Sequence, residues 1–203
     1  MLQELFNLVK NVAGESVINN PAIPNEQNNE VVAEATNTVA SGLRNIVAGG
    51  GIGSLISLFT GGQQQGSQNN LLSNPIVSMM IGHFAGKLMN KFNIGNQQAS
   101  GIAASLIPGI ISTLINRTND QSDNTFTLDN LLRSITGGQT DQVAQQNPQF
   151  NIGNLISQFT GGGQQQQQDP GIMDIISQLA GGAQQQQARN GGGLLDLIKG
   201  FTQ

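Results

Sequence analysis

The sequence predicts an all-α protein: a small helical domain plus repeated short amphipathic helices joined by Gly/Gln-rich linkers. Apolar residues recur at helical spacing along much of the chain, and no alternating pattern of useful strand length is found. Short segments with one shared apolar spacing recur beside runs of Gly and Gln. We therefore place a helical domain at residues 1–136 and a low-complexity tail with three short amphipathic helices at residues 137–203.

The first long helix is expected over residues 26–48. Pro24, Asn25 and Glu26 offer an N-terminal cap, and three glycines at positions 49–51 follow the last periodic apolar residue. Between these signals, apolar residues recur every three or four positions, as one helix face requires. They are Val31, Val32, Ala35, Val39, Leu43, Ile46 and Val47.

Two further helices are expected in the centre of the chain. Asn74 and Pro75 form a helix start, because asparagine caps well and proline is tolerated at the first helical position. That helix should end near Gly95. Asn96 can cap the next one, which Pro108 should kink or break because proline lacks the amide donor of the helical ladder.

A short apolar unit is repeated along the chain. In each copy the apolar residues fall at relative positions 1, 4, 5 and 8, which form one stripe of a helix. The copies are IGSLISLFTGG (52–62), LDNLLRSITGG (128–138), IGNLISQFTGG (152–162), IMDIISQLAGG (172–182) and LLDLIKGFTQ (194–203), with a weaker copy, LQELFNLVK, at 2–10. Each unit therefore predicts two to three turns of helix.

The ends of the tail units carry capping signals. Asn151 and Asp169 can act as N-caps, and Pro170 follows at a first helical position. Gly161 and Gly181 can adopt the left-handed conformation that ends a helix. The sequence therefore predicts that the first two tail helices end at Gly161 and Gly181 and that the Gly/Gln spacers, about ten residues long, span roughly 18 Å as flexible coil.

The stripes of the three tail units are the predicted interaction residues, because helices this short are marginal in water and need an apolar surface to pack on. That surface could belong to this chain, to another copy, to a partner protein or to a lipid interface. As an alternative, the units could be helices of one folded domain joined by long loops, as in a solenoid. The residues are Ile152, Leu155, Ile156, Phe159, Ile172, Ile175, Ile176, Leu179, Leu194, Leu197, Ile198 and Phe201.

The central run NPIVSMMIGHFAGKLMNKFNIGNQQASGIAASLIPGIISTLI (74–115) resembles the bacterial YidB-like domain of unknown function. The shared features are a helix ending in a Lys-hydrophobic-x-Ile-Gly turn, a small-residue segment and an aliphatic-Pro-aliphatic stretch around Pro108. The Gly-rich ending GGGLLDLIKGF (191–201) is similar as well. The resemblance covers about half the chain and implies a compact helical bacterial domain. It implies no activity and no functional residues.

Charged residues are sparse, and they disfavour nucleic-acid binding. The formal net charge is −4, and among the eight basic residues only Lys87 and Lys91 are close enough to share a helix face. Nucleic-acid binding requires a basic stripe that neutralises phosphates. Glu26, Glu30 and Glu34 share another face at i, i+4 spacing, where we expect a solvated stripe.

No catalytic residue, cofactor site or metal site is predicted. His83 is the only histidine, and the residues after it on the same helix offer no metal-ligand spacing. Ser57 and Ser157 recur with the repeated unit, and one histidine cannot serve as base for several serines. The glycines at 49–53 lack the Lys-Ser/Thr ending of a phosphate loop. Without cysteine, thiolate ligands and a Cys nucleophile are excluded.

The function expected from these features is that of a non-enzymatic self-assembling scaffold, a homo-oligomer or filament held by the repeated amphipathic helices. The alternatives are a membrane-peripheral or membrane-active protein, and an adaptor that binds another protein through its tail. Neither a signal peptide nor a transmembrane segment is evident, because the apolar stretches near 76–89 and 102–115 are short and interrupted. We therefore expect a cytoplasmic location.

Overall fold

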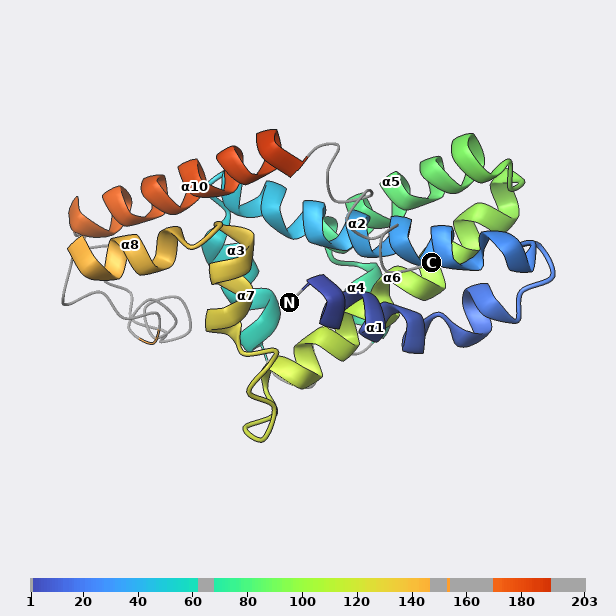
Figure 1. The fold of residues 1–203 in the computed structure, drawn as a ribbon, viewed down its shortest axis with the longest axis horizontal. Coiled ribbons are helices and arrows are strands. Elements are labelled where there is room, and N and C mark those ends of the chain that lie inside the picture. The colour runs from blue at the N-terminus through green and yellow to red at the C-terminus, as the bar shows by residue number, and fades with distance from the viewer. Residues whose placement is uncertain (1, 62–67, 147–152, 154–169, 191–203) are drawn as a thin grey trace.

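The computed structural model describes residues 2–61, 68–146, 153 and 170–190 (Figure 1). Across these residues the regular secondary structure is helical and no strand is found, which confirms the all-α class. The elements are α1 (Leu2–Val12), η1 (Gly14–Ile18), η2 (Asn25–Gln27), α2 (Asn28–Ala48), α3 (Ile52–Thr60), α4 (Gln68–Leu72), α5 (Pro75–Phe92), α6 (Asn96–Thr118), α7 (Leu128–Ile135), α8 (Gln139–Gln146) and α10 (Pro170–Asn190).

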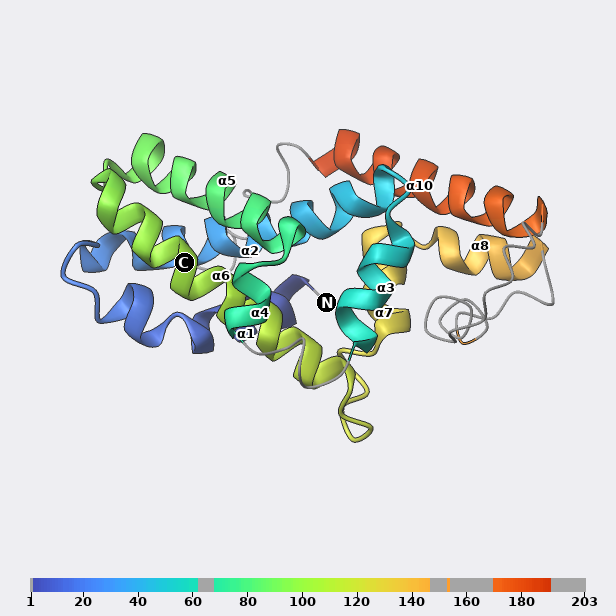
Figure 2. The same cartoon turned by 180° about the vertical axis from the view of Figure 1, so that it is seen from behind.

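Helices α2, α5 and α6 form the centre of the fold. Helix α5 packs along α6, and both contact α2 (Figures 1 and 2). Helix α6 carries the richest apolar face, and Leu106, Ile107, Ile110 and Ile111 are fully buried in it. Because α1, α3 and α4 also contact α6, the core surrounds this helix on several sides.

The predicted end of α2 and the predicted start of α5 are confirmed, whereas α2 begins at Asn28 without a side-chain cap and α5 ends at Phe92, with Asn93 as its left-handed C-cap. Helix α2 follows the 3-10 turn η2 and ends before Gly49, and Gly50 has a φ of 80° that favours glycine. At the start of α5, the Asn74 side chain accepts hydrogen bonds from the amides of Ile76 and Val77. Both ends therefore form for the reasons that the sequence indicated.

Helix α6 corrects two expectations. Its N-cap is Gly95, which makes no side-chain capping bond, whereas Asn96 already belongs to the helix. The helix also continues through Pro108 to Thr118 without the predicted break. Pro108 is itself buried, with buried apolar residues on both sides, so packing outweighs the local cost of roughly 3 kcal/mol for an internal proline.

Helix α6 is also longer and more continuous than the sequence suggested. Within the described ranges it is the one helix long and apolar enough to cross a membrane by length and composition. However, 56% of its most apolar window is buried inside the protein. A core helix passes the same test, so this helix is weak evidence for a membrane span.

Helices α3 and α7 are repeated units that lie in the core, as does the weaker copy in α1, whose Leu5, Phe6 and Val9 are buried. In α3 the stripe residues Ile52, Leu55, Ile56 and Phe59 are at most 1% exposed. The corresponding residues of α7 are buried as well, and the Thr127 side chain caps its first turn. Both helices end at or just before their glycine pair, as predicted. The repeated stripe is therefore a core-packing face wherever the structure describes it completely.

Helix α10 departs from the predicted short unit. It starts at Pro170 as expected but runs through Gly181 and Gly182 and along the following glutamines to Asn190. The prediction that Gly181 ends the helix is wrong, and this Gln-rich spacer is helical instead of coil. Ala and Gln are good helix formers, and a Cβ on Gly182 would lie 2.7 Å from the Thr136 carbonyl oxygen, so a glycine is needed for this close packing.

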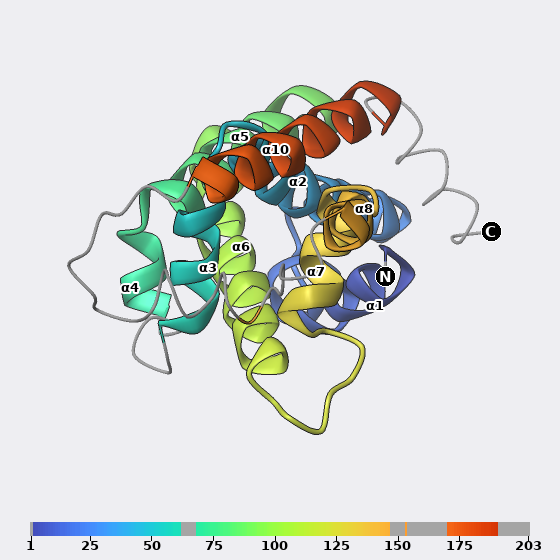
Figure 3. The ribbon, with the colours of Figure 1, turned by 90° about the vertical axis from the view of Figure 1, so that its left-hand side faces the viewer.

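Helix α10 packs on the helical domain. It lies antiparallel along the C-terminal half of α2 and also contacts α8 (Figures 1 and 3). Leu179 and Ala183 are buried in the same hydrophobic core as the central helices, and Val143 of α8 joins them. The Gln184 amide donates a hydrogen bond to the Ala48 carbonyl at 3.1 Å. The boundary after residue 136 stays a prediction, but α8 and α10 are docked on the preceding helices.

Candidate functional site

The predicted interaction residues fall into two groups. Those of the units at 152–159 and 194–201 lie outside the described residues, as does the Ile172 side chain. The structure places Ile175, Ile176 and Leu179 of α10. One unit of the three can therefore be examined directly.

The stripe of α10 packs against its own chain. Leu179 is 1% exposed, and Ile175 and Ile176 are partly buried against the same core. Met173, which lies outside the stripe, is 58% exposed. The positions chosen by periodicity therefore are the packing positions, and here the surface they pack on belongs to the same molecule. Periodicity alone missed Ala183, which is fully buried beyond the unit.

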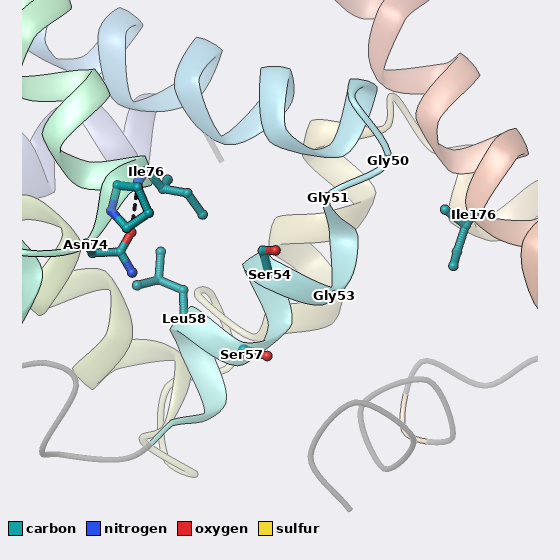
Figure 4. Close-up of a pocket in the computed structure, with 10 residues that line it drawn as sticks. Gly50, Gly51, Gly53, Ser54, Ser57, Leu58, Asn74, Ile76 and Ile176 are labelled. Carbon is teal, nitrogen blue, oxygen red and sulfur yellow. Dashed lines mark hydrogen bonds between the residues drawn. The ribbon is translucent and has the colours of Figure 1, made fainter. Parts of the chain in front are cut away.

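A groove of about 720 Å³ lies between α3, the start of α5 and α10. The glycines and serines at the start of α3 form one side of it, and Leu58, Ile76 and Ile176 contribute apolar side chains (Figure 4). Small residues on a helix surface permit close approach of another helix or chain. Ile176 is the single predicted interaction residue of the described part that lines this groove.

The polar groups of this groove suit binding better than catalysis. Its lining holds the hydroxyls of Ser54 and Ser57 and the amide of Asn74, which is engaged in capping α5. The described residues of the lining include no imidazole and no carboxylate that could act as a general base. In the described ranges, no group of three His, Cys, Asp or Glu residues that could hold a metal ion occurs either. Shape and apolar contact are what this groove offers a ligand.

Glu34 is a buried carboxylate between α2 and α5, and it corrects the predicted solvated stripe. Its side chain is 3% exposed and forms ion pairs with Lys87 and, at 2.9 Å, with Lys91. Burial by itself raises the pKa of the Glu34 carboxyl, but hydrogen bonds and charge from the two lysines outweigh it, so the pKa lies below the ordinary value. The shared face of Lys87 and Lys91 was the signal available in the sequence.

Arg44 is a second buried charge on α2, and the sequence gave no sign of it. The residue is 6% exposed, and its Nε is buried without a hydrogen-bond partner. Burial lowers the pKa of this guanidinium because the charged form is desolvated. Arg44 lies one helical turn before Ala48 on α2.

Comparisons with known proteins add no relative. No family model matches the chain, and no significantly similar protein was found among curated proteins or solved structures. The resemblance to the YidB-like domain therefore stays a prediction.

Proposed function

We propose that this protein is a non-enzymatic scaffold that assembles with copies of itself through the repeated amphipathic unit at residues 152–159. The observation that carries the proposal is the near identity of residues 152–162 to residues 52–62. The two segments differ only where Asn154 replaces Ser54 and Gln158 replaces Leu58. One of these segments is a core helix, so the other has the same demand for an apolar surface.

The two differences indicate what kind of surface the copy needs. Leu58 is 2% exposed beside the α3 stripe, so α3 is buried over a broad face. Gln158 replaces it with a polar side chain, whereas Ile152, Leu155, Ile156 and Phe159 keep the stripe. A helix with a single apolar stripe packs on a surface or on another such helix, and burial of each large side chain contributes roughly 1.5–3 kcal/mol before ordering entropy.

Helix α10 supports the proposal by showing how such a unit docks. Its stripe residue Leu179 lies in the core, and Ile175 and Ile176 pack against it. Once α10 is docked, its stripe is used within the chain, so the units at 152–159 and 194–201 are left for contacts between copies, and the first of these is the near copy of α3. Several weak contacts of this kind on one molecule gain strength through effective concentration.

The test is a pair of charge insertions on opposite faces of one unit. Leu155→Asp with Ile156→Asp places two carboxylates in the stripe, and Ser157→Asp with Gln158→Asp places the same two charges beside it. We expect the stripe variant to lose the assembled species in light scattering after size exclusion, and the control to keep it. Equal masses for the stripe variant and the wild type would contradict assembly through this unit.

Point variants are the better test because a truncation after Thr136 disturbs the core. Such a truncation removes α8 and α10 and uncovers the face of α2 that α10 covers. A truncated chain could then associate through the newly exposed face or unfold. Circular dichroism of both double variants checks that the helical domain is intact before their masses are compared.

A further inference from the structure

A small cavity of about 120 Å³ lies between α2 and α5, apart from the groove beside α3. Pockets for organic ligands usually measure roughly 300–1,000 Å³, so this cavity suits a single ion better than a larger molecule. Two methionines and the one histidine of the chain form its wall on α5, and small or polar residues form its wall on α2. The lining residues are Met79, Met80 and His83 on α5, and Thr38, Ser41, Gly42 and Asn45 on α2.

The two methionines place one sulfur on the buried side of the cavity and one on its open side. A Cβ on Gly42 would lie 2.9 Å from the Met80 sulfur, so this sulfur rests closely against the backbone of α2. Met80 is 2% exposed, whereas Met79 is 59% exposed. The absence of a side chain at Gly42 therefore lets packing fix one thioether beside the cavity, while the other is accessible from solvent.

His83 is a neighbour of both methionines on the surface of α5. It lies four residues after Met79 and three after Met80, and residues at these spacings have Cβ atoms about 5–6 Å apart. The imidazole makes no hydrogen bond or ion pair with another described residue. The residues after His83 offer no ligand spacing, but the two methionines before it do, and a nitrogen of its ring is available to a ligand.

The hydroxyl groups that α2 contributes to the cavity are already engaged as donors. The Thr38 hydroxyl donates to the Glu34 carbonyl at 2.8 Å, and the Ser41 hydroxyl donates to the Asn37 carbonyl. The described lining contains neither a carboxylate nor a thiolate, which are the charged ligands typical of Zn²⁺, Mg²⁺ and Ca²⁺ sites. Two thioethers and one imidazole are therefore the metal ligands that distinguish this cavity.

We propose that Met79, Met80 and His83 bind one Cu(I) ion between α2 and α5. Thioether sulfur is a soft ligand that selects Cu(I), and imidazole suits copper as well. The Lys87 ammonium, one turn beyond His83, is paired with Glu34, so its charge is compensated close to the site. The ion would join the exposed and the buried edge of α5, and its binding does not depend on the proposed assembly.

The test is a titration of the full-length chain with Cu(I), supplied as its acetonitrile complex without oxygen. We expect one ion per chain, and we expect Met79→Leu, Met80→Leu and His83→Gln each to weaken binding. Each loss should be about tenfold or more, because changes outside the ligands themselves already cost roughly 10–100-fold in metal affinity. No binding of Cu(I) by the wild type, or full affinity in all three variants, would overturn the proposal.

Met173→Leu is the matched control. Met173 lies on α10 and is 58% exposed, almost the same as Met79, so the control removes an equally accessible sulfur away from the cavity. We expect its affinity for Cu(I) to stay within twofold of the wild type. Equal losses for Met79→Leu and Met173→Leu would assign the binding to exposed thioethers in general and contradict the site.

NMR of the methionine methyl groups locates the ion directly. The chain has five methionines, and the signals of Met79 and Met80 should shift together on addition of Cu(I), whereas that of Met173 should not. Circular dichroism checks that the leucine variants stay folded, which is expected because Met→Leu conserves volume. Zn²⁺ that binds as tightly as Cu(I), with the same losses in the variants, would show that the site does not select a soft ion and would contradict the proposal.

Discussion

Helix α2 packs against both α5 and α10, and the two interfaces differ in their close contacts and in their charged residues. On the α5 side, Gly42 lets Met80 approach so closely that a Cβ on the glycine would lie 2.6 Å from the methionine Cε. On α10, Gly182 makes a similarly close approach, to Thr136 at the end of α7 and Gln139 at the start of α8. Helix α2 also holds two buried charged residues: Glu34 is paired with two lysines of α5, whereas the Arg44 Nε has no hydrogen-bond partner among the described residues.

The two interfaces of α2 also differ in how they are held together. The α2–α5 interface joins elements of the predicted domain and contains both halves of its ion pair. The α2–α10 interface has apolar packing and a hydrogen bond to the Ala48 carbonyl, and no ion pair joins the two helices among the described residues. The first interface therefore depends on charge as well as on apolar burial, and the second mainly on apolar burial.

The largest expected effect tests whether α10 is an integral part of the core. Leu179 is 1% exposed, so Leu179→Ala should lower the free energy of unfolding by about 2–5 kcal/mol through lost burial and a cavity. Met173→Ala removes a side chain that is 58% exposed and should change stability by less than about 0.5 kcal/mol. Urea denaturation followed by helicity measures both. Equal, small effects would show that α10 is not docked as described.

The next effect tests the charge pairing between α2 and α5. Glu34→Gln should lower the free energy of unfolding by about 1–3 kcal/mol at neutral pH, because the hydrogen bonds to Lys87 and Lys91 lose their charge. This is less than for a fully enclosed pair, since the Lys91 side chain is 40% exposed.

The same ion pair predicts a dependence of stability on pH. The pKa of Glu34 is lower in the folded protein than its ordinary value, so its contribution is complete above the ordinary glutamate pKa of about 4.3 and is lost as the pH falls through the lower folded value. The urea midpoint of the wild type should therefore fall more steeply on acidification than that of Glu34→Gln. Parallel curves for the two proteins would contradict the lowered pKa.

The smallest effects compare adjacent glycines inside α10. A Cβ on Gly182 would meet the Thr136 carbonyl oxygen at 2.7 Å, whereas nothing lies within 4 Å of a Cβ on Gly181. We expect Gly182→Ala to destabilise by about 1–2 kcal/mol through overpacking and Gly181→Ala to stabilise by about 0.5–1 kcal/mol through helix propensity. Thermal unfolding distinguishes them, and the same sign for both would mean that α10 does not pack closely against residue 136.

Much of the fold could be predicted from the sequence because its signals are local. The Asn74 cap and the glycines after α2 act on their immediate neighbours. The apolar stripe of α3 predicts which of its residues are buried. The errors arose where distant packing decided the outcome. Pro108 stays inside a helix because its surroundings are buried, and Gly181 does not end α10 because the following residues favour helix and pack on α2 and α8.

The candidate site was predicted less completely than the fold. Periodicity identified Leu179 and its neighbours as packing positions but could not say which surface they pack on. Periodicity also placed Glu34 with Glu26 and Glu30 on one solvated face. Glu34 is buried instead because α5 packs over it, and the spacing of the three residues does not contain that information. Arg44 offered no signal, because one basic residue among apolar neighbours does not reveal which helix will cover it.

The measurement that tests the proposed assembly most directly is the solution mass of the full-length chain over a range of concentrations. One chain has a mass of 21.3 kDa. Light scattering after size exclusion should give a multiple of this mass, with larger species at higher concentration, if the unit at residues 152–159 joins copies. A mass of one chain at every concentration would contradict the account.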